Sequence, residues 1–316
     1  MSQPIVVDLA ATRAALPFPD LIAALREAFI AGAEVPLRHR HAIDVPGASE
    51  ATLLLMPAWR AGAVGVKIVS VYPSNGARGL NAVHSTYLLS EGDTGRPLAL
   101  IDGNEITGRR TAAASALAGD HLARRDASSL LIVGAGHIAG LMAQAWAAVR
   151  PIRRVQVWNR NTAKAETLAA DLRAEGFDAT ATPGLEAAAR QADIISCATL
   201  SATPLILGEW LKPDAHLDLI GGYRPDMRET DDTAIRRARI WIDTPAALAE
   251  AGDLTQPIES GVLDKGTLAG DLAGLCRGRV AGRLIDGEIT LFKSVGSAIE
   301  DLAAASLVWK TVRQEG

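Results

Sequence analysis

The sequence has few cysteines and no excess of positive charge. Of its 316 residues only Cys197 and Cys276 are cysteines. Both stand in apolar surroundings, so we expect reduced core residues of a cytosolic protein and no disulfide. The 32 Lys and Arg residues are outnumbered by 36 Asp and Glu, which gives a net charge of −4. No basic face can be traced along the chain, and this argues against a nucleic-acid partner.

Long apolar runs are also missing. No stretch of about 18 apolar residues occurs, so no membrane-spanning helix is expected. The start, "MSQPIVVDLAATRAALPF", has no basic region followed by a long apolar run. We therefore expect no signal peptide and a cytoplasmic location.

What the chain does contain is enough apolar material for two domains. The apolar fraction is 48 % and the charged fraction 22 %, values typical of a globular protein. In the first third, Leu21, Leu25 and Phe29 share one face of a predicted helix that Asp20 would cap. "ATLLLMPAW" and "AVGVKIVSVYP" predict strands, "HSTYLLSEGDTGRPLALIDG" predicts a hairpin, and "NEITGRRTAAASALAGDHLA" predicts a helix.

The pattern changes near residue 126, where strands and helices begin to alternate. The strands "SSLLIVGAG", "RVQVWNR", "ADIISCAT", "AHLDLIGG" and "ARIWID" are continuous apolar runs, as expected when both faces of a sheet are covered. The sequence therefore predicts an α/β fold, with a doubly wound parallel sheet over residues 118–296. An α+β substrate domain would comprise residues 1–117 and a C-terminal helix over 297–316.

A glycine-rich turn follows the first of these strands. "LLIVGAGHIAG" places Gly134, Gly136 and Ala139 in the G-x-G-x-x-A spacing, between a buried strand and a helix. Gly134 would allow the tight turn, and Gly136 would let the backbone approach a pyrophosphate. The helix start at His137 and Ile138 would supply free N–H groups and the positive end of the helix dipole. This context predicts a dinucleotide site.

The second strand of this domain ends in "VWNRN". NAD-binding units usually carry Asp or Glu here, to accept hydrogen bonds from the ribose. This chain carries Asn159 and Arg160. A guanidinium would pair with a 2′-phosphate, so we expect NADPH to be preferred, with NADH possible. Alternatively, Arg160 is a solvated charge at the end of a strand.

Three cations occur in otherwise apolar segments of the first third. Arg38 lies in "VPLRHRHAI", Lys67 in "AVGVKIVSV" and Arg110 in "TGRRTAAAS". Together they suggest a receptor for a small carboxylate, although each alone could be an edge charge. His39 and His41 form an HxH pair without accompanying ligands, so no metal is expected. For His84 we expect a hydrogen-bonded core position, with a proton donor as the alternative.

The stretch "LIGGYRPDMRE" ends a buried strand with two glycines and then presents Tyr223. A strand that ends in Gly-Gly often brings backbone close to a ligand. Tyr223 is therefore a candidate site residue.

Five stretches of the chain together resemble the ornithine cyclodeaminase / mu-crystallin family. They are "GVKIVSVYPSN", "GRRTAAASALAGDHLA", "LLIVGAGHIAG", "LIGGYRPDMRE" and "TLFKSVGSAIEDLAAAS". They occur in the same order as in the family and span residues from about 35 to 310. The resemblance implies a homodimer and a substrate carboxylate held by Arg38, Lys67 and Arg110. The cofactor would be lined by Thr111, Gly134, Gly136, His137, Ile138, Ala139, Asn159, Arg160, Thr199, Leu219, Ile220, Ser294 and Val295.

Tyr223 departs from the cyclodeaminating members of the family. Those members carry an aspartate after Gly-Gly, which contacts the substrate's amino groups and acts as acid and base. A phenol carries no charge at neutral pH and cannot replace a carboxylate in that role. The stretch is closer to the imine-reducing branch. We therefore expect NAD(P)H-dependent reduction of a cyclic ketimine carboxylate: Δ1-pyrroline-2-carboxylate to L-proline, or Δ1-piperideine-2-carboxylate to L-pipecolate. Lys67 or water would supply the proton, and Tyr223 would contribute a hydrogen bond or shape.

Three alternatives stay open. Ornithine cyclodeaminase activity would release ammonia from L-ornithine with regenerated NAD⁺. An alanine-type amino-acid dehydrogenase would require ammonia for NAD(P)H oxidation. A non-catalytic NADPH-binding protein would bind the cofactor without turnover.

Overall fold

The computed structural model describes residues 3–315, which form two compact units. The first unit is the chain up to Arg110 together with the segment from Ser297 onward, and the second is Thr111–Gly296. The division between the two units falls between Arg110 and Thr111, inside the helix α3 (Gly103–Leu122). The domain boundary that the sequence predicts, after residue 117, lies in the same helix.

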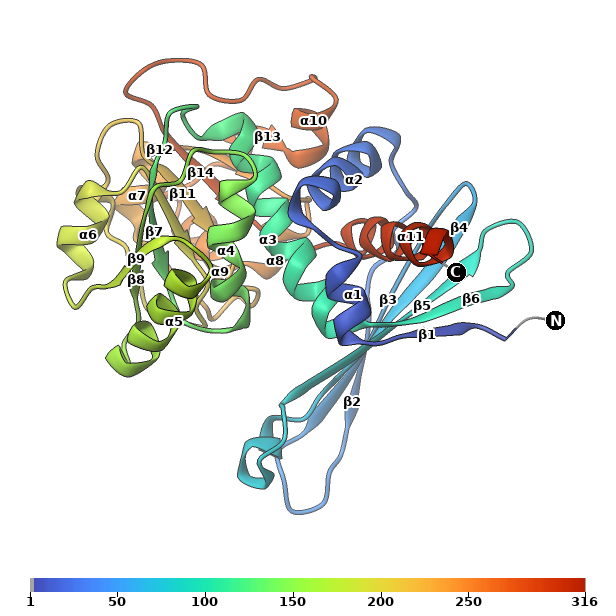
Figure 1. The fold of residues 1–316 in the computed structure, drawn as a ribbon. Helices are drawn as coiled ribbons and strands as arrows, with labels where there is room; N and C mark the ends of the chain where they lie inside the picture. Colours follow the sequence, from blue (N-terminus) through green and yellow to red (C-terminus); the bar gives the residue numbers. More distant parts are fainter. Residues whose placement is uncertain (1–2, 316) are drawn as a thin grey trace. The chain divides into compact units, whose positions relative to one another are not determined.

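The first unit contains an open, mostly antiparallel sheet (Figure 1). Among the described residues its six strands have the order β1-β6-β5-β4-β3-β2, and only the β1–β6 pair is parallel. The strands are β1 (Ile5–Val7), β2 (His39–Ile43), β3 (Ala51–Arg60), β4 (Ala63–Val71), β5 (Val83–Glu91) and β6 (Pro97–Asp102). The predicted strands β3 and β4 and the predicted β5–β6 hairpin are confirmed.

One face of this sheet is buried under helices. The helices of the first unit are α1 (Leu9–Ala14), α2 (Phe18–Ala31), the first part of α3, and α11 (Ala298–Glu315), with a short 3₁₀ helix at Pro73–Arg78. The helix α11 packs on α2 and on β3 to β6. Alternate residues of β4 therefore differ in burial: Lys67 and Val69 are buried, whereas Ile68 is 37 % exposed.

The predicted apolar face of α2 is confirmed, because Leu21, Leu25 and Phe29 are all buried. The prediction for Asp20 is wrong. Pro17 occupies the N-cap position, and Asp20 lies inside the first turn. A proline near the start of a helix costs no backbone hydrogen bond, so the helix begins earlier than a side-chain cap would indicate.

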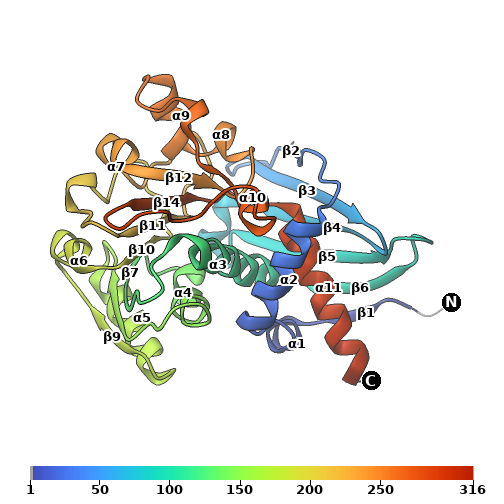
Figure 2. The same cartoon turned by 90° about the horizontal axis from the view of Figure 1, so that it is seen from above.

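The second unit is the predicted doubly wound parallel sheet. Its eight described strands have the order β13-β12-β14-β11-β10-β7-β8-β9, and all neighbours run parallel. They are β7 (Ser129–Val133), β8 (Arg154–Trp158), β9 (Asp178–Ala181), β10 (Ile194–Cys197), β11 (His216–Leu219), β12 (Ala238–Ile242), β13 (Gly270–Asp271) and β14 (Ile289–Lys293). Strand β14 enters between β11 and β12 (Figure 2). The order reverses between β7 and β10, which is where such sheets bind their ligands.

Helices cover both faces of this sheet. They are α4 (His137–Ala147), α5 (Thr162–Ala174), α6 (Leu185–Gln191), α7 (Asp232–Arg237), α8 (Ala247–Glu250), α9 (Gly252–Glu259) and α10 (Leu272–Cys276), with 3₁₀ helices at Gly208–Trp210 and Lys265–Thr267. Alternate residues of β11 reach opposite sides. Leu217 and Leu219 join an apolar cluster with residues of α6 and α7, whereas Asp218 accepts a hydrogen bond from Ser115 of α3 at 2.8 Å.

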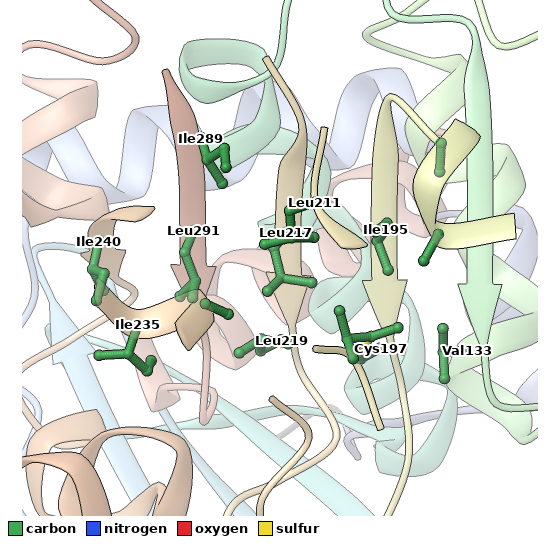
Figure 3. Close-up of a cluster of buried hydrophobic side chains, with 14 of the residues drawn as sticks. Val133, Ile195, Cys197, Leu211, Leu217, Leu219, Ile235, Ile240, Ile289 and Leu291 are labelled. Carbon is green, nitrogen blue, oxygen red and sulfur yellow. The ribbon is translucent and has the colours of Figure 1, made fainter. Parts of the chain in front are cut away.

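The apolar cluster on the α6/α7 side is the core of the second unit (Figure 3). Cys197 lies within it, fully buried beside Leu219 and Val133. Cys276 is only partly buried, so the prediction of a core position is wrong for this cysteine. No disulfide links cysteines in the described part of the chain.

No helix among the described residues is long and apolar enough to cross a membrane.

Candidate active site

The glycine-rich turn has the geometry that its sequence predicts. It joins β7 to α4, and Gly134 has φ +120°. A Cβ at Gly134 would lie 2.6 Å from the carbonyl oxygen of Ala198, just after β10, so only glycine fits. The turn therefore lies at the point where the strand order reverses.

The start of α4 is open to a ligand. Gly136 is the N-cap, no described side chain caps the helix, and no described atom lies within 4 Å of where its Cβ would stand. The first N–H groups of α4, from His137 and Ile138, thus lack a side-chain acceptor, while Ala139 is fully buried against the sheet. Uncapped N–H groups and an approachable backbone fit the pyrophosphate of a dinucleotide.

The other predicted cofactor residues follow the carboxyl ends of neighbouring parallel strands. Asn159 and Arg160 follow β8; the amide of Asn159 donates to the carbonyl of Asn161 at 3.0 Å, and Arg160 is exposed. Thr199 follows β10, Ile220 follows Leu219 at the end of β11, and Ser294 and Val295 follow β14. These positions lie along one edge of the sheet because the strands are parallel. Thr111 is buried in α3.

A buried carboxylate that sequence reasoning missed organises the Gly-Gly turn. Glu229 accepts from the N–H groups of Gly221 and Gly222 at 2.9 and 3.2 Å, and from the N–H and hydroxyl of Thr199 at 2.8 and 2.7 Å. A Cβ at Gly221 would come within 2.0 Å of the Thr199 carbonyl oxygen. Burial raises the pKa of Glu229, and Lys293 opposes that rise.

Lys293 is a second residue that the sequence did not single out. It ends β14, is fully buried, and lies 3.0 Å from Asp253 and 3.9 Å from Glu229. Asp253 also accepts from the N–H of Glu229 at 2.7 Å. The sequence signal for Lys293 is its place within the apolar run "TLFKSV". The same kind of signal, a lysine inside an apolar segment, indicates Lys67.

Ser294 and Val295 are held by Asp243, which follows β12. Asp243 accepts from the Ser294 hydroxyl at 3.1 Å and from the N–H groups of Val295 and Gly296 at 2.8 and 2.7 Å. Burial raises the pKa of Asp243 against these hydrogen bonds. One carboxylate therefore fixes the backbone of the segment from Ser294 to Gly296.

Tyr223 follows the Gly-Gly turn that Glu229 holds, and it is 48 % exposed. Its neighbour Arg224 pairs with Asp226, and the backbone of Gly222 is buried. The turn thus presents the phenol away from the core of the second unit.

In the first unit, the structure brings Lys67 and Arg110 to the same carboxylate. Asp301 of α11 accepts from Lys67 Nζ at 2.9 Å and from Arg110 Nε at 2.9 Å. Arg110 Nη1 also donates to Glu300 at 2.8 Å, and Lys67 Nζ donates to the hydroxyl of Thr107 at 3.2 Å. Lys67 and Arg110 are 2 % and 5 % exposed.

Arg38 is partly exposed and immediately precedes β2. His39 pairs with Leu55 across β2 and β3, and Met56 pairs with Lys67 across β3 and β4. Pairing in β2 begins at His39, so Arg38 lies just outside the strand.

The histidines of the first unit lie elsewhere. His39 and His41 are exposed on β2 with ring centroids 6.5 Å apart. His84 is exposed on β5, where it pairs with Ser70, so the prediction of a core histidine is wrong. The alternation of β5 explains this, because Tyr87 and Leu89 take its buried positions.

The chain is thus a two-domain α/β protein with a dinucleotide-type turn in one unit and a buried pair of cations in the other. The chain belongs to the ornithine cyclodeaminase/mu-crystallin family, whose model matches residues 6–316.

Named relatives agree with this assignment. A Δ1-pyrroline-2-carboxylate reductase of Paracoccus denitrificans is 40 % identical over 265 residues, covering 83 % of this chain and 84 % of its own length. The structure of the Thermococcus litoralis Δ1-pyrroline-2-carboxylate reductase in complex with NADH and L-proline matches with a TM-score of 0.92 at 33 % identity, over 99 % of this chain and 98 % of that one. An archaeal alanine dehydrogenase dimer with bound NAD matches with a TM-score of 0.90 at 26 % identity, over 99 % and 97 %.

Proposed function

We propose that this protein reduces cyclic ketimine carboxylates with a nicotinamide cofactor, converting Δ1-pyrroline-2-carboxylate to L-proline and Δ1-piperideine-2-carboxylate to L-pipecolate. The observation that carries the proposal is the meeting of two buried cations, Lys67 and Arg110, at one point of the first unit. Two reductases of this substrate class are also among its similar proteins.

The carboxylate of the substrate would be held by Arg110, Lys67 and Arg38. Arg110 offers a planar fork that suits a carboxylate, and Lys67 adds a compact charge. Burial lowers the pKa of Lys67 to about 8, so its ammonium form still predominates at neutral pH. Lys67 Nζ or water would protonate the imine nitrogen, which makes the neighbouring carbon a better hydride acceptor.

The cofactor would bind along the carboxyl edge of the parallel sheet. The N–H groups at the start of α4 would hold the pyrophosphate, and Thr111, Thr199, Leu219, Ile220, Ser294 and Val295 would line the rest of the dinucleotide. When bound, the reduced nicotinamide supplies the hydride. Glu229 and Asp243 would keep this edge rigid by fixing its turns.

We propose NADPH as the preferred form. Arg160 is exposed where the ribose of the adenosine half would lie, and Asn159 cannot repel a 2′-phosphate as a carboxylate would. The similar structures that name a cofactor contain NADH or NAD, so NADH turnover is also expected.

A homodimer is also proposed. The outer face of the first-unit sheet carries Ile68 and Leu100, which are 37 % and 36 % exposed. Apolar side chains on an uncovered sheet face favour association, and the similar alanine dehydrogenase is a dimer. Cytoplasmic location stays a proposal; it is supported by Cys197 and Cys276, which form no disulfide in the described chain.

An amino-acid dehydrogenase reaction is the second candidate, favoured by the similarity to alanine dehydrogenase. Ornithine cyclodeamination is disfavoured because Tyr223 stands where that reaction needs a carboxylate.

A panel of assays separates these candidates: each cyclic imine with NAD(P)H, pyruvate and ammonia with NAD(P)H, and L-ornithine with NAD⁺. The proposal requires turnover of an imine without ammonia. Turnover only with ammonia and an oxo acid, or only with ornithine, would reject it.

A further inference from the structure

Asp301 lies at the centre of the cation pair in the first unit. Its two carboxylate oxygens lie 2.9 and 2.8 Å from Lys67 Nζ, and one of them also accepts from Arg110 Nε at 2.9 Å. Asp301 and its neighbour Glu300 are fully buried in the first turn of α11, where the helix dipole favours negative charge. Both cations are therefore anchored to a single side chain.

The surroundings of Lys67 explain why such an anchor is needed. The groups that face Lys67 come from several elements: Thr107 and Arg110 of α3, Glu300 and Asp301 of α11, Tyr87 opposite it on β5, and Met56 opposite it on β3. Only Glu300 and Asp301 carry negative charge, and Glu300 is bound to Arg110. The ammonium form of a lysine buried among these groups depends on Asp301.

The electrostatics agree with this geometry. Burial is the largest influence on Lys67 and lowers its pKa to about 8, and the charge of Asp301 is the main influence in the opposite direction. The positive charge of Arg110 lowers the pKa further. Without the carboxylate of Asp301, the amine of Lys67 would lose its proton at a lower pH.

We propose that Asp301 is a positioning residue for the substrate carboxylate: it keeps Lys67 in its ammonium form and fixes the orientation of Arg110, so that both cations meet the anion together. This inference rests on the proposed function. Glu300 pairs with Arg110 and has a weaker influence on Lys67 than Asp301 has, so it provides a comparison on the same turn of α11.

The test compares Asp301→Asn with Glu300→Gln. In Asp301→Asn, the alkaline limb of kcat/KM for the imine should move to lower pH by at least about one unit, which raises KM at pH 8 about fivefold or more. At pH 5.5 the KM should fall back toward that of the wild type, because acid restores the ammonium group of Lys67. The increase that remains measures the lost anchor of Arg110. Glu300→Gln should move the limb much less. A purely structural defect would not be repaired by acid.

A second readout does not depend on turnover. With ¹⁵N-lysine labelling, the Nζ signal of Lys67, assigned by its loss in Lys67→Met, should titrate near pH 8 in the wild type and lower in Asp301→Asn. Asp301→Glu, which keeps the carboxylate, should restore most of the difference. Wild-type Lys67 that is already deprotonated at neutral pH would overturn the inference even if Asp301→Asn fails to fold.

The two proposals can fail separately. A wild-type protein that reduces no imine would reject the proposed function, while the Nζ titration would still report on Asp301. Normal imine turnover, combined with an Asp301→Asn variant whose titration and pH profile match those of the wild type, would reject the role of Asp301 alone.

Discussion

The carboxylate of Glu229 accepts a hydrogen bond from the backbone N–H of Gly221 at 2.9 Å and so fixes the turn that presents Tyr223. The same side chain holds Thr199 after the neighbouring strand. One buried carboxylate therefore ties together two loops at the edge of the sheet where the cofactor is proposed to bind.

Glu229→Gln should weaken NADPH binding. The amide cannot accept on both sides, so backbone N–H groups lose an acceptor, at a cost of about 1–3 kcal/mol for a buried unsatisfied donor. Binding followed by fluorescence titration should show a dissociation constant raised about tenfold.

Glu288→Gln is the matched control, since Glu288 also accepts from a backbone N–H, that of Leu284 at 3.0 Å. Equal NADPH affinities for Glu229→Gln and the wild type would contradict the role of Glu229.

Arg110→Met should raise KM for the imine about ten- to a hundredfold, as expected for a lost charge-assisted hydrogen bond, with a smaller effect on cofactor binding. Arg109→Met is the control. Arg109 is also buried in α3, but it donates to the carbonyl of Leu16 and stacks on Phe18. Steady-state kinetics of both variants provide the measurement, and an unchanged KM in Arg110→Met would refute the carboxylate assignment.

Arg160→Ala should lower the preference for NADPH over NADH. Loss of a guanidinium–phosphate pair is expected to raise KM for NADPH about tenfold while leaving KM for NADH nearly unchanged. Lys164→Ala, which removes another exposed charge from the start of α5, controls for general electrostatics. If the ratio of the two specificity constants is the same in Arg160→Ala and the wild type, Arg160 is only a solvated charge.

Ile68→Arg should dissociate the proposed homodimer, because it places a charge on the apolar outer face of the first-unit sheet. Light scattering coupled to size-exclusion chromatography should report the monomer mass. Ile285→Arg, at a position 67 % exposed in the second unit, should remain dimeric. A wild-type protein that runs as a monomer at micromolar concentration would exclude the dimer.

Asp193 should contribute to stability in a pH-dependent way. It accepts from the N–H groups of Ser128 and Ser129, both at 3.0 Å, and lies 2.7 Å from Lys212. These partners hold its pKa well below the ordinary value, although burial acts in the opposite direction. A depressed carboxyl pKa stabilises the fold above the unfolded-state value, and the stabilisation is lost as pH falls below it.

Asp193→Asn should therefore lower the free energy of unfolding at pH 7 by about 1–3 kcal/mol, and by less near pH 3. Urea unfolding at both pH values measures the difference. A loss of stability that is the same at pH 7 and pH 3 would show that the charge of Asp193 has no part in it.

The sequence predicts most of the order of strands and helices, because buried parallel strands appear as continuous apolar runs and the glycine turn has a fixed spacing. It also reveals Lys67 and Arg110, since a cation within an apolar segment stands out. Their carboxylate partner could not be predicted: Arg110 and Asp301 are 191 positions apart. In the sequence, Glu300 and Asp301 fit the ordinary acidic first turn of a helix.

Strand β14 cannot be predicted from the sequence for a related reason. Its five residues follow a long irregular segment, and its place between β11 and β12 depends on pairing with strands distant in the chain. The role of Glu229 cannot be predicted either. Nothing in "PDMRE" indicates that the side chain of Glu229, and not that of Asp226, is buried against the Gly-Gly turn. Asp226 is instead exposed and paired with Arg224.

The most direct measurement follows NADPH absorbance at 340 nm with purified protein and Δ1-pyrroline-2-carboxylate near neutral pH, without ammonia, together with analysis of the product. The expected result is rapid oxidation of NADPH with one L-proline formed per cofactor consumed. No oxidation with either NADPH or NADH, while both bind, would contradict imine reduction and direct attention to L-ornithine with NAD⁺.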